Sequence, residues 1–251
     1  MARLDPDLLL RAYSVGVFPM ANSREAADVF WVEPKKRGVL PLDGFHLSRS
    51  LAKTLRSGRF GFTADAAFEQ VVRLCAEPTP GRPDTWINPD IQRAYAELHG
   101  RGYAHSIETW EGDRLVGGLY GVRLGAAFFG ESMFSRVRDA SKVALAHLVA
   151  RLKVGGFRLL DCQFQTDHLA SLGAVEIDRA DYVVLLDEAL GLASAPAGGG
   201  AGRGAPVAGF SPSPPADFFA LDRGAADTAE ALTVSGPVSA CRIVQLLGQT
   251  S

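Results

Sequence analysis

The chain has 251 residues, of which 47% are hydrophobic and 22% are charged, and its formal net charge is −2 at pH 7. This length suffices for one large domain, or for a main domain with a small companion. The nearly balanced charge argues against a globally basic nucleic-acid-binding protein, although it leaves room for a local basic patch. Three scattered cysteines are typical of a reducing compartment, and no run reaches the ~18 apolar residues of a membrane span. We therefore expect a cytoplasmic protein without a membrane segment.

Four helices and one strand are predicted in the first hundred residues. Each helix carries apolar residues at helical spacing, and two of them have a cap residue followed by a first-turn proline: Asp5 before Pro6, and Asn88 before Pro89. The strand is the apolar run VFWVEP. The predicted elements are a helix from Pro6, a strand over residues 29–34, and helices over residues 46–58, 63–76 and 88–102.

A meander of three strands is predicted next, because apolar segments alternate with the short polar turns EGD and RLG. The strongest helix of the chain follows, with Leu145, Leu148 and Leu152 on one face and Gly155 at its end. The predicted elements are strands over residues 104–110, 114–122 and 126–132, a helix over 138–156, a strand over 158–164, and helices over 166–173 and 179–190. This order indicates an α+β fold.

The composition changes at Ala193. The stretch SAPAGGGAGRGAPVAGFSPSPP is rich in Gly, Ala, Pro and Ser, which is typical of a flexible linker. The later stretch LTVSGPVSACRIVQLL is apolar enough to dock on the body or to form a short strand. Neither stretch carries residues that suggest chemistry, so residues 193–251 are interpreted as a linker and tail without an assigned role.

A carboxylate and an acid–amide pair are the candidate chemical groups. Glu131 lies in FFGESMFSR, where burying a carboxylate among apolar residues is costly unless it has a partner. Asp161 and Gln163 are two positions apart on a predicted strand, so both side chains point to the same face. An acid and an amide on one face could orient an amine and receive its proton. Both features also fit polar groups that are hydrogen-bonded in a purely structural role, and the residues alone leave the choice open.

No metal, nucleotide or serine-nucleophile site is predicted. The scattered His and Cys residues lack the spacing of metal ligands, and neither a P-loop nor a strand-linked G-x-G-x-x-G is present. GESMF lacks the second glycine of a nucleophile elbow, because Phe134 stands at that position. We therefore expect neither a metal nor a cofactor.

Two groups of basic residues are candidate anion-binding surfaces. The first recurs at helical spacing opposite the leucines of the helix over 46–58. The second gathers at the start of the helix over 138–156, where free backbone amides also favour an anion. The residues are Arg49, Lys53 and Arg56 in the first group, and Arg136, Arg138 and Lys142 in the second. Such surfaces suit a phosphate backbone, although each group also fits an ordinary solvated face.

Several motifs, in this order, resemble those of one family over about residues 5–190. They are FPM, HLSRS, TWI, HSIE, LVGGLYGV, FFGESMFSR, ASK, LLDCQ and DHLASLGA, and GESMFSR together with DCQ is the most specific combination. The chain thereby resembles the leucyl/phenylalanyl-tRNA–protein transferases. The resemblance implies a small N-terminal domain over residues 1–36 and a larger domain over 37–192 that is similar to the GNAT acetyltransferase fold, with a mixed, largely antiparallel sheet and flanking helices. Residues 193–251 lie outside it.

The resemblance also implies a reaction and its partners. Members of the family transfer Leu or Phe, and sometimes Met, from aminoacyl-tRNA to proteins whose N-terminus is Arg or Lys, which marks these proteins for degradation by the N-end rule pathway. No covalent enzyme intermediate is needed, because the ester bond to the tRNA is already activated. The helix that carries Arg49, Lys53 and Arg56 becomes a contact to the tRNA backbone. We expect a monomer.

Roles for the candidate polar groups follow from the same matching. Glu131 would help to hold the aminoacyl-adenosine end, Gln163 would orient the attacking α-amine, and Asp161 would polarise this amine and relay its proton. Whether the Asp161–Gln163 pair takes the proton, or only positions the amine while the tRNA ribose hydroxyl acts as the shuttle, stays open.

The resemblance further implies an apolar pocket for an amino-acid side chain that is unbranched at Cβ, such as Leu or Phe. Its walls would be Met20, Trp86, Leu119, Phe128, Met133, Leu148 and Leu160. Met20 stands where the family often has Trp, which softens one wall and bears on the preference between Phe and Leu.

Two other classes of protein are alternatives. A GNAT-type N-acyltransferase that uses an acyl-CoA would carry a glycine-containing pyrophosphate loop before the long helix, but SRVRDASK has no glycine there. A non-catalytic RNA-binding module would not explain an acid–amide pair beside an apolar pocket, and it would usually be more basic.

Overall fold

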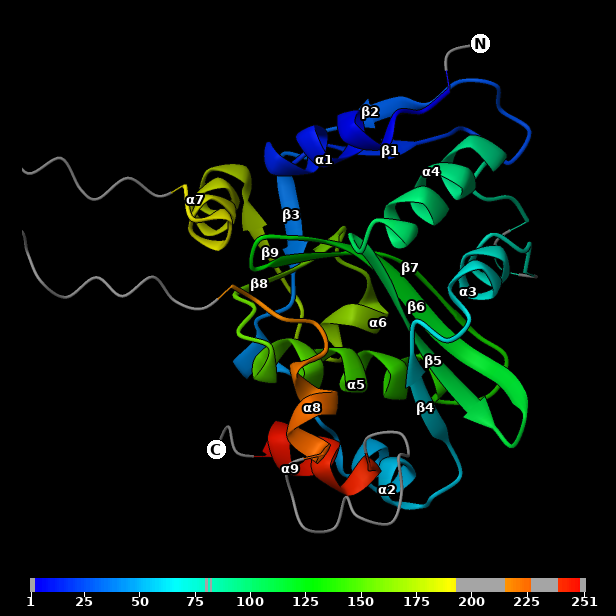
Figure 1. Ribbon diagram of the computed structural model, residues 1–251, viewed down its shortest axis with the longest axis vertical. Coiled ribbons are helices and arrows are strands. Elements are labelled where there is room, and N and C mark those ends of the chain that lie inside the picture. The colour runs from blue at the N-terminus through cyan, green and yellow to red at the C-terminus, as the bar shows by residue number, and fades with distance from the viewer. Residues whose placement is uncertain (1–2, 80, 82, 193–214, 227–238, 249–251) are drawn as a thin grey trace, which may run out of the picture.

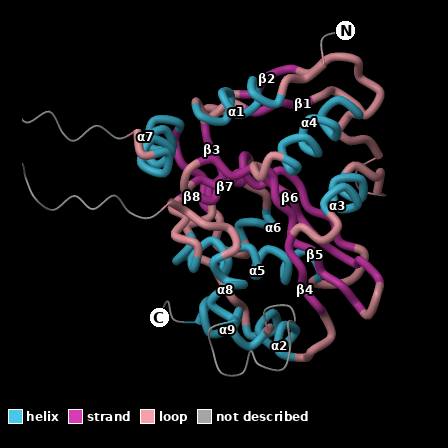
Figure 2. Tube along the Cα trace, viewed as in Figure 1, coloured by secondary structure: helices cyan, strands magenta, loops and turns pink. Residues whose placement is uncertain are grey.

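The chain folds around a central sheet with helices on both faces (Figure 1 and Figure 2). The computed structural model describes residues 3–79, 81, 83–192, 215–226 and 239–248. Two hydrophobic cores lie on the opposite faces of the sheet, and this arrangement leaves the strand ends of the sheet as the place where groups from both faces can meet. Within the described ranges, no helix is both long and apolar enough to cross a membrane.

The main sheet has seven strands in the order β4-β5-β6-β7-β8-β3-β9. All neighbouring strands pair antiparallel except β7 and β8, which are parallel. The strands are β3 (Lys36–Val39), β4 (Gly61–Ala64), β5 (Ala104–Glu111), β6 (Arg114–Leu124), β7 (Ala127–Ser135), β8 (Leu159–Gln163) and β9 (Val175–Asp178). The predicted α+β fold with a mixed, largely antiparallel sheet is therefore confirmed, as is the meander of β5, β6 and β7.

Helix α5 (Ala140–Val154) covers one face of the sheet and is buried along most of its length. It can approach the sheet closely because Gly117 has no side chain: a Cβ at that position would lie 2.6 Å from the Cβ of Ala140. As predicted, Gly155 follows the end of the helix. The other elements that pack on this face are η1 (Leu42–Gly44), α2 (Arg49–Arg56), α6 (Asp167–Ala170), α8 (Ala220–Ala226) and α9 (Ala240–Gly248).

The opposite face is covered by α1 (Pro6–Ser14), α3 (Phe68–Cys75), α4 (Pro89–Gly100) and α7 (Arg179–Leu190). Helices α1 and α4 begin at the predicted caps, since Asp5 accepts a hydrogen bond from the backbone N–H of Asp7 and Asn88 accepts one from that of Ile91, both at 2.9 Å. A small antiparallel hairpin, β1 (Phe18–Met20) with β2 (Phe30–Val32), lies beside α1 and outside the main sheet.

The short strands β1, β3, β4 and β9 were not predicted, because three or four residues are too few to show an alternating pattern. The helix predicted over 63–76 begins only at Phe68, since Thr63 and Ala64 belong to β4 and Asp65 turns the chain with φ of 59°. At the end of the chain, the described part of the apolar stretch docks on the body as helix α9, and residues 227–238 lie outside the described residues. The linker predicted from residue 193 lies, up to residue 214, outside the described residues.

Candidate active site

A cavity of about 300 Å³ opens where the parallel strands β7 and β8 separate. Their ladder ends at the pair Phe129 and Asp161. The residues that follow on each strand, 130–133 and 162–164, line the cavity, and α5 contributes Leu145 and Leu148. Because the strands part here, side chains from both faces of the sheet reach one space.

Six of the seven residues predicted for the apolar pocket line this cavity. They are Met20, Trp86, Leu119, Met133, Leu148 and Leu160. Phe128 does not line it. This side chain is fully buried and packs against the rings of Phe157 and Phe218. It fills the space left by Gly121, where a Cβ would lie 2.4 Å from the Phe128 ring, so Phe128 supports the core beside the cavity.

Glu131 stands on a β-bulge of β7, because Gly130 pairs with Gly121 and Ser132 pairs with Tyr120, which leaves the residue between them without a direct partner. The bulge directs its carboxylate to the hydroxyl groups of two helix residues. Tyr13 donates to Oε1 at 2.7 Å, and Tyr95 donates to Oε2 at 2.8 Å. The Nε2 group of Gln163 also donates to Oε1, at 2.9 Å. The cost of burying the carboxylate is thus offset by three donors.

Burial raises the pKa of Glu131 from 4.5 to about 7, against the hydrogen bonds from Tyr13, Tyr95 and Gln163, which lower it. The folded protein therefore binds this proton more tightly than the unfolded chain does. We expect the free energy of unfolding to fall as the pH rises from about 4.5 to about 7, by an amount on the order of 3 kcal/mol from this group.

Urea denaturation of the wild type and of Glu131→Gln, each at about pH 5 and about pH 8, measures this effect. Other titrating groups contribute equally to both proteins, so the difference between the two pH profiles isolates Glu131. Parallel profiles would show that the carboxyl group does not change its protonation in this range.

Asp161 lies at the centre of a second polar network, which is fully buried. Arg37 donates to both carboxylate oxygens, from Nε to Oδ1 at 2.9 Å and from Nη2 to Oδ2 at 2.6 Å. The hydroxyl of Tyr182 donates to Oδ2 at 2.8 Å, and the backbone N–H of Gln163 donates to Oδ1 at 2.7 Å. The Arg37 guanidinium also stacks over the rings of Phe18 and Tyr182, each 4.6 Å away. Asp161 is not among the residues that line the cavity.

The backbone of Gln163 has φ of 63°, a left-handed conformation that is uncommon for a residue other than glycine. Two contacts hold it: the hydrogen bond from its N–H to Asp161, and the close packing of Gly38, its partner in β3. A Cβ on Gly38 would lie 2.7 Å from the backbone of Phe164 and of Gln165. The missing side chain of Gly38 thus allows the segment that presents Gln163 to pass close to β3.

Gly38→Ala is therefore expected to push this segment away. We expect the free energy of unfolding to fall by about 1–3 kcal/mol, because the added methyl group clashes with the backbone of this segment. Any activity that depends on Gln163 should fall as well, because this residue is displaced. Gly61→Ala is the matched control, since a Cβ there would meet only the Trp110 Cβ, at 3.9 Å. Denaturant unfolding and activity are measured on both variants, and equal behaviour of the two would contradict the packing argument.

Four residues of these networks were not predicted from the sequence: Tyr13, Arg37, Tyr95 and Tyr182. The tyrosines lie on the apolar faces of their helices, where a hydroxyl has no visible partner in the sequence. Arg37 lies in the charged stretch KKRG, which reads as exposed although the side chain is only 1% exposed. His168 also lines the cavity, and its Nε2 is buried without a hydrogen-bond partner among the described residues.

The two predicted basic groups differ in their surroundings. Arg49, Lys53 and Arg56 are exposed on α2, and no ion pair involves them within the described part of the chain. In the second group, Arg136 pairs with Glu77, whereas Arg138 is 89% exposed and lies 3.7 Å from Asp139. Lys142, in the first turn of α5, is half-buried, and its charge contributes to the lowered pKa of His168, after the larger effect of burial.

The α+β fold and the cavity define a site of the kind found in enzymes. Apolar side chains form its walls, and a buried carboxylate and an amide group form its polar end. The sequence profile of the family described as leucyl/phenylalanyl-tRNA protein transferase matches residues 39–187, and that of the N-terminal domain of the same family matches residues 2–35. The chain belongs to the leucyl/phenylalanyl-tRNA–protein transferase family, and it is an aminoacyltransferase.

Curated relatives agree with this assignment. The leucyl/phenylalanyl-tRNA–protein transferase of Rhizorhabdus wittichii is 70% identical over 252 residues, which cover 100% of both chains. That of Zymomonas mobilis is 70% identical over 187 residues, 74% of this chain and 70% of the relative. That of Phenylobacterium zucineum is 58% identical over 211 residues, 81% of this chain and 96% of the relative. The family resemblance of the sequence motifs is therefore confirmed.

Proposed function

We propose that the protein transfers Leu or Phe, and also Met, from aminoacyl-tRNA to the α-amine of proteins that begin with Arg or Lys. This transfer would mark those proteins for degradation by the N-end rule pathway in the cytoplasm, where aminoacyl-tRNA is made. The cavity carries this proposal, because its apolar walls suit the transferred side chain and Gln163 stands beside Glu131 on the polar wall. The parting of β7 and β8 also supports a GNAT-like main domain, and the two family matches support its placement over 37–192 with a small N-terminal domain over 1–36. We also propose that the protein is a monomer.

Gln163 is suited to orient the attacking amine. Its Nε2 group is engaged by Glu131, which leaves its amide oxygen as an acceptor for an N–H of the substrate amine. The uncharged fraction of the α-amine, whose ordinary pKa is about 8, attacks the ester carbonyl carbon. The new C–N bond forms, the bond from this carbon to the ribose oxygen breaks, and the amine proton ends on the departing ribose oxygen, which becomes a hydroxyl group.

Glu131 fixes the amide plane of Gln163, and its own carboxylate is held by Tyr13 and Tyr95. In this proposal Asp161 is a positioning residue. Its charge is matched by Arg37, and it reaches the site through the backbone N–H of Gln163. The Asp161–Gln163 pair therefore only positions the amine. The ribose hydroxyl of the tRNA is the shuttle that passes the amine proton to the departing oxygen.

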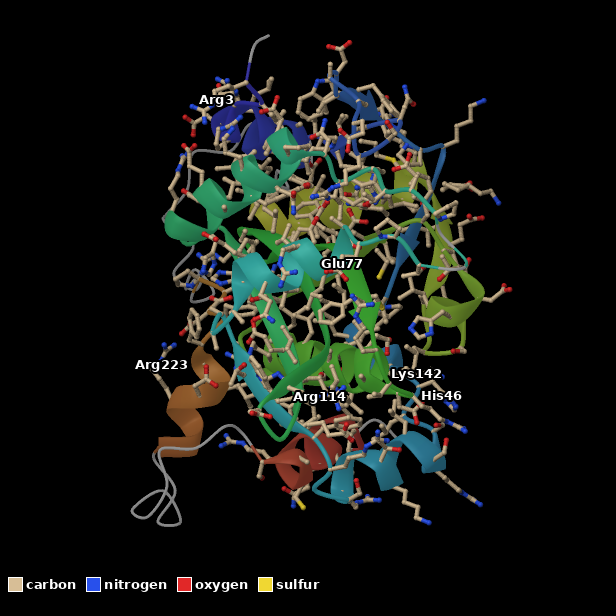
Figure 3. The ribbon with its side chains drawn as sticks, turned by 90° about the vertical axis from the view of Figure 1, so that its right-hand side faces the viewer. Arg3, His46, Glu77, Arg114, Lys142 and Arg223 are labelled. Atoms are coloured by element: carbon tan, nitrogen blue, oxygen red, sulfur yellow. The ribbon has the colours of Figure 1, made fainter. Side chains whose placement is uncertain are left out.

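We further propose that α2 binds the tRNA phosphate backbone. Its three cations are exposed and free of ion pairs within the described residues, so each can neutralise a phosphate. Lys142 is suited to contact the tRNA between α2 and the cavity. It lies on the side of the molecule where α2 lies (Figure 3), and its charge lowers the pKa of His168, which lines the cavity.

Replacing Arg49, Lys53 and Arg56 together by alanine is expected to weaken tRNA binding, because three phosphate contacts and their released counterions are lost. The slope of log K against log salt should flatten by about one unit per lost contact. Binding is measured by titration at several salt concentrations. Reaction with a minimal aminoacyl-adenosine analogue, which lacks the tRNA backbone, should keep its rate.

Arg114→Ala is the control for a general loss of positive charge, since Arg114 is also exposed but belongs to β6 and not to α2. It should leave the slope unchanged. A triple variant with the wild-type slope would assign the α2 cations to an ordinary solvated face.

One assay tests the proposed reaction. The protein is incubated with labelled Phe-tRNA or Leu-tRNA and a peptide whose N-terminus is Arg, and the label in the peptide is measured. We expect transfer without acyl-CoA, and none to the same peptide with an acetylated N-terminus, because the reacting group is then blocked. Absence of transfer, or a requirement for acyl-CoA, would overturn the proposal in favour of an RNA-binding module or an acyl-CoA enzyme.

A further inference from the structure

The described residues of the C-terminal segment, 215–226 and 239–248, lie outside the region that the family profiles match. They contact both α5, which lines the cavity, and α2, which carries the exposed basic residues. Helix α8 packs on α5, whereas α9 packs on both α5 and α2. Figure 1 and Figure 3 show α9 alongside α2 at one end of the molecule. Because α5 contributes Leu145 and Leu148 to the cavity, this segment connects the cavity wall to the basic helix.

The α8 part is fastened to α5 by a bidentate ion pair. Arg151 is buried in α5, and its Nη1 and Nη2 groups donate to the two carboxylate oxygens of Asp222 at 2.6 and 2.7 Å. Nη1 also donates to the backbone carbonyl of Phe218 at 2.8 Å. The Phe218 ring is fully buried and stacks on His105 of β5, with 4.1 Å between the ring centroids. A bidentate pair with an enclosed guanidinium is a specific anchor.

The α9 part covers the inner face of α2. Ile243, Val244 and Leu247 are buried in the same core as Leu51 and Leu55 of α2. On the edge of this contact, Arg56 lines a shallow groove together with residues 241, 244, 245 and 248 of α9. Helix α2 has only eight residues, and so short a helix depends on packing for its stability and position.

We propose that the C-terminal segment is a brace that fixes α2 relative to α5, so that RNA bound on the outer face of α2 presents its aminoacyl end to the cavity. The partner recognised on that face is a phosphate backbone, and this inference rests on the RNA-binding role proposed above for α2. Ile243, Asp222 and Arg151 are positioning residues in this account, because they act through α2 and touch neither substrate.

Ile243→Asn in the full chain tests the brace, because a polar side chain in the core weakens the docking of α9. Val184→Asn is the matched control, because it makes the same kind of change at an exposed position of α7, on the other face of the sheet. We expect the KM for aminoacyl-tRNA to rise about tenfold or more in Ile243→Asn, as for the loss of one or two phosphate contacts. The kcat and the rate with the aminoacyl-adenosine analogue should stay near wild type, and Val184→Asn should leave all three quantities unchanged. Ile243→Val, which keeps most of the buried surface, should have a KM close to that of the wild type.

A merely structural role would give a different pattern: reaction with tRNA and with the analogue would fall together, following the loss of folded protein in a thermal unfolding curve. That pattern, or an unchanged KM for aminoacyl-tRNA, would overturn the brace. Ile243→Ala, which leaves no polar group in the core, replaces the asparagine variant if the latter does not fold, with the same expected split at smaller size. If the triple α2 variant weakens tRNA binding while Ile243→Asn does not, the brace alone falls. If the triple α2 variant binds tRNA like wild type, the RNA role of α2 falls, and the brace falls with it.

Discussion

Gln163→Ala is expected to lower the single-turnover rate of aminoacyl transfer by about 10²–10⁴-fold, the usual effect of losing a group that orients a reacting amine. This corresponds to roughly 3–5 kcal/mol of transition-state stabilisation. The affinity for aminoacyl-tRNA should change little, because the apolar walls and the cations of α2 remain in place. Rapid-quench measurement of the transfer rate, alongside tRNA titration, separates the two quantities.

Gln165→Ala is the matched control for this variant. Gln165 lies two residues further along the same segment, and its amide donates to the backbone carbonyl of Ala174 at 3.1 Å, away from Glu131. We expect it to keep most of the transfer rate. A Gln163→Ala protein that transfers at nearly the wild-type rate would reduce Gln163 to a structural hydrogen bond and leave positioning of the amine to Glu131.

Arg37→Met is expected to lower the free energy of unfolding by about 3–5 kcal/mol at neutral pH, because it leaves the buried Asp161 carboxylate without its counter-charge. Transfer should fall as well, since the Asp161 carboxylate that accepts the hydrogen bond from the backbone N–H of Gln163 would no longer be fixed. Denaturant unfolding at equilibrium measures the stability change.

Two further variants complete this experiment. The double variant Arg37→Met with Asp161→Asn removes both charges and should recover part of the lost stability. Arg179→Met breaks an ion pair of similar type with Glu33, but this pair is about half exposed, so the loss should be about 1 kcal/mol or less. Equal stability losses in Arg37→Met and Arg179→Met would contradict the role assigned to the buried pair.

Local signals in the sequence predicted the larger elements well. The cap Asn88 followed by Pro89 marks the start of α4, and the apolar segments between the EGD and RLG turns give the meander. Asp161 and Gln163 follow from the two-residue spacing on β8, and most walls of the cavity follow from the resemblance to the family. These features are contained in short windows of sequence, which is why they can be predicted.

The polar networks could not be predicted because their partners are distant in the chain. Tyr13 is 118 residues from Glu131, and Arg37 is 124 residues from Asp161. The bulge that aims Glu131 depends on the register between β6 and β7, and the sequence of neither strand specifies such an irregularity alone. The resemblance to the family placed Phe128 in the cavity. Its burial in the core could not be predicted, because it depends in part on Phe218, a residue of the C-terminal segment to which composition assigned no role.

We propose that the cavity between β7 and β8 receives the aminoacyl end, with Gln163 beside the reacting carbonyl. A crystal structure of the protein with a non-hydrolysable phenylalanyl-adenosine analogue would show where this end binds. We expect the phenyl ring among Leu119, Met133 and Leu148, and the carbonyl carbon within reach of an amine that is hydrogen-bonded to the amide oxygen of Gln163. An analogue bound outside this cavity, or one whose carbonyl group points away from Gln163, would contradict the account.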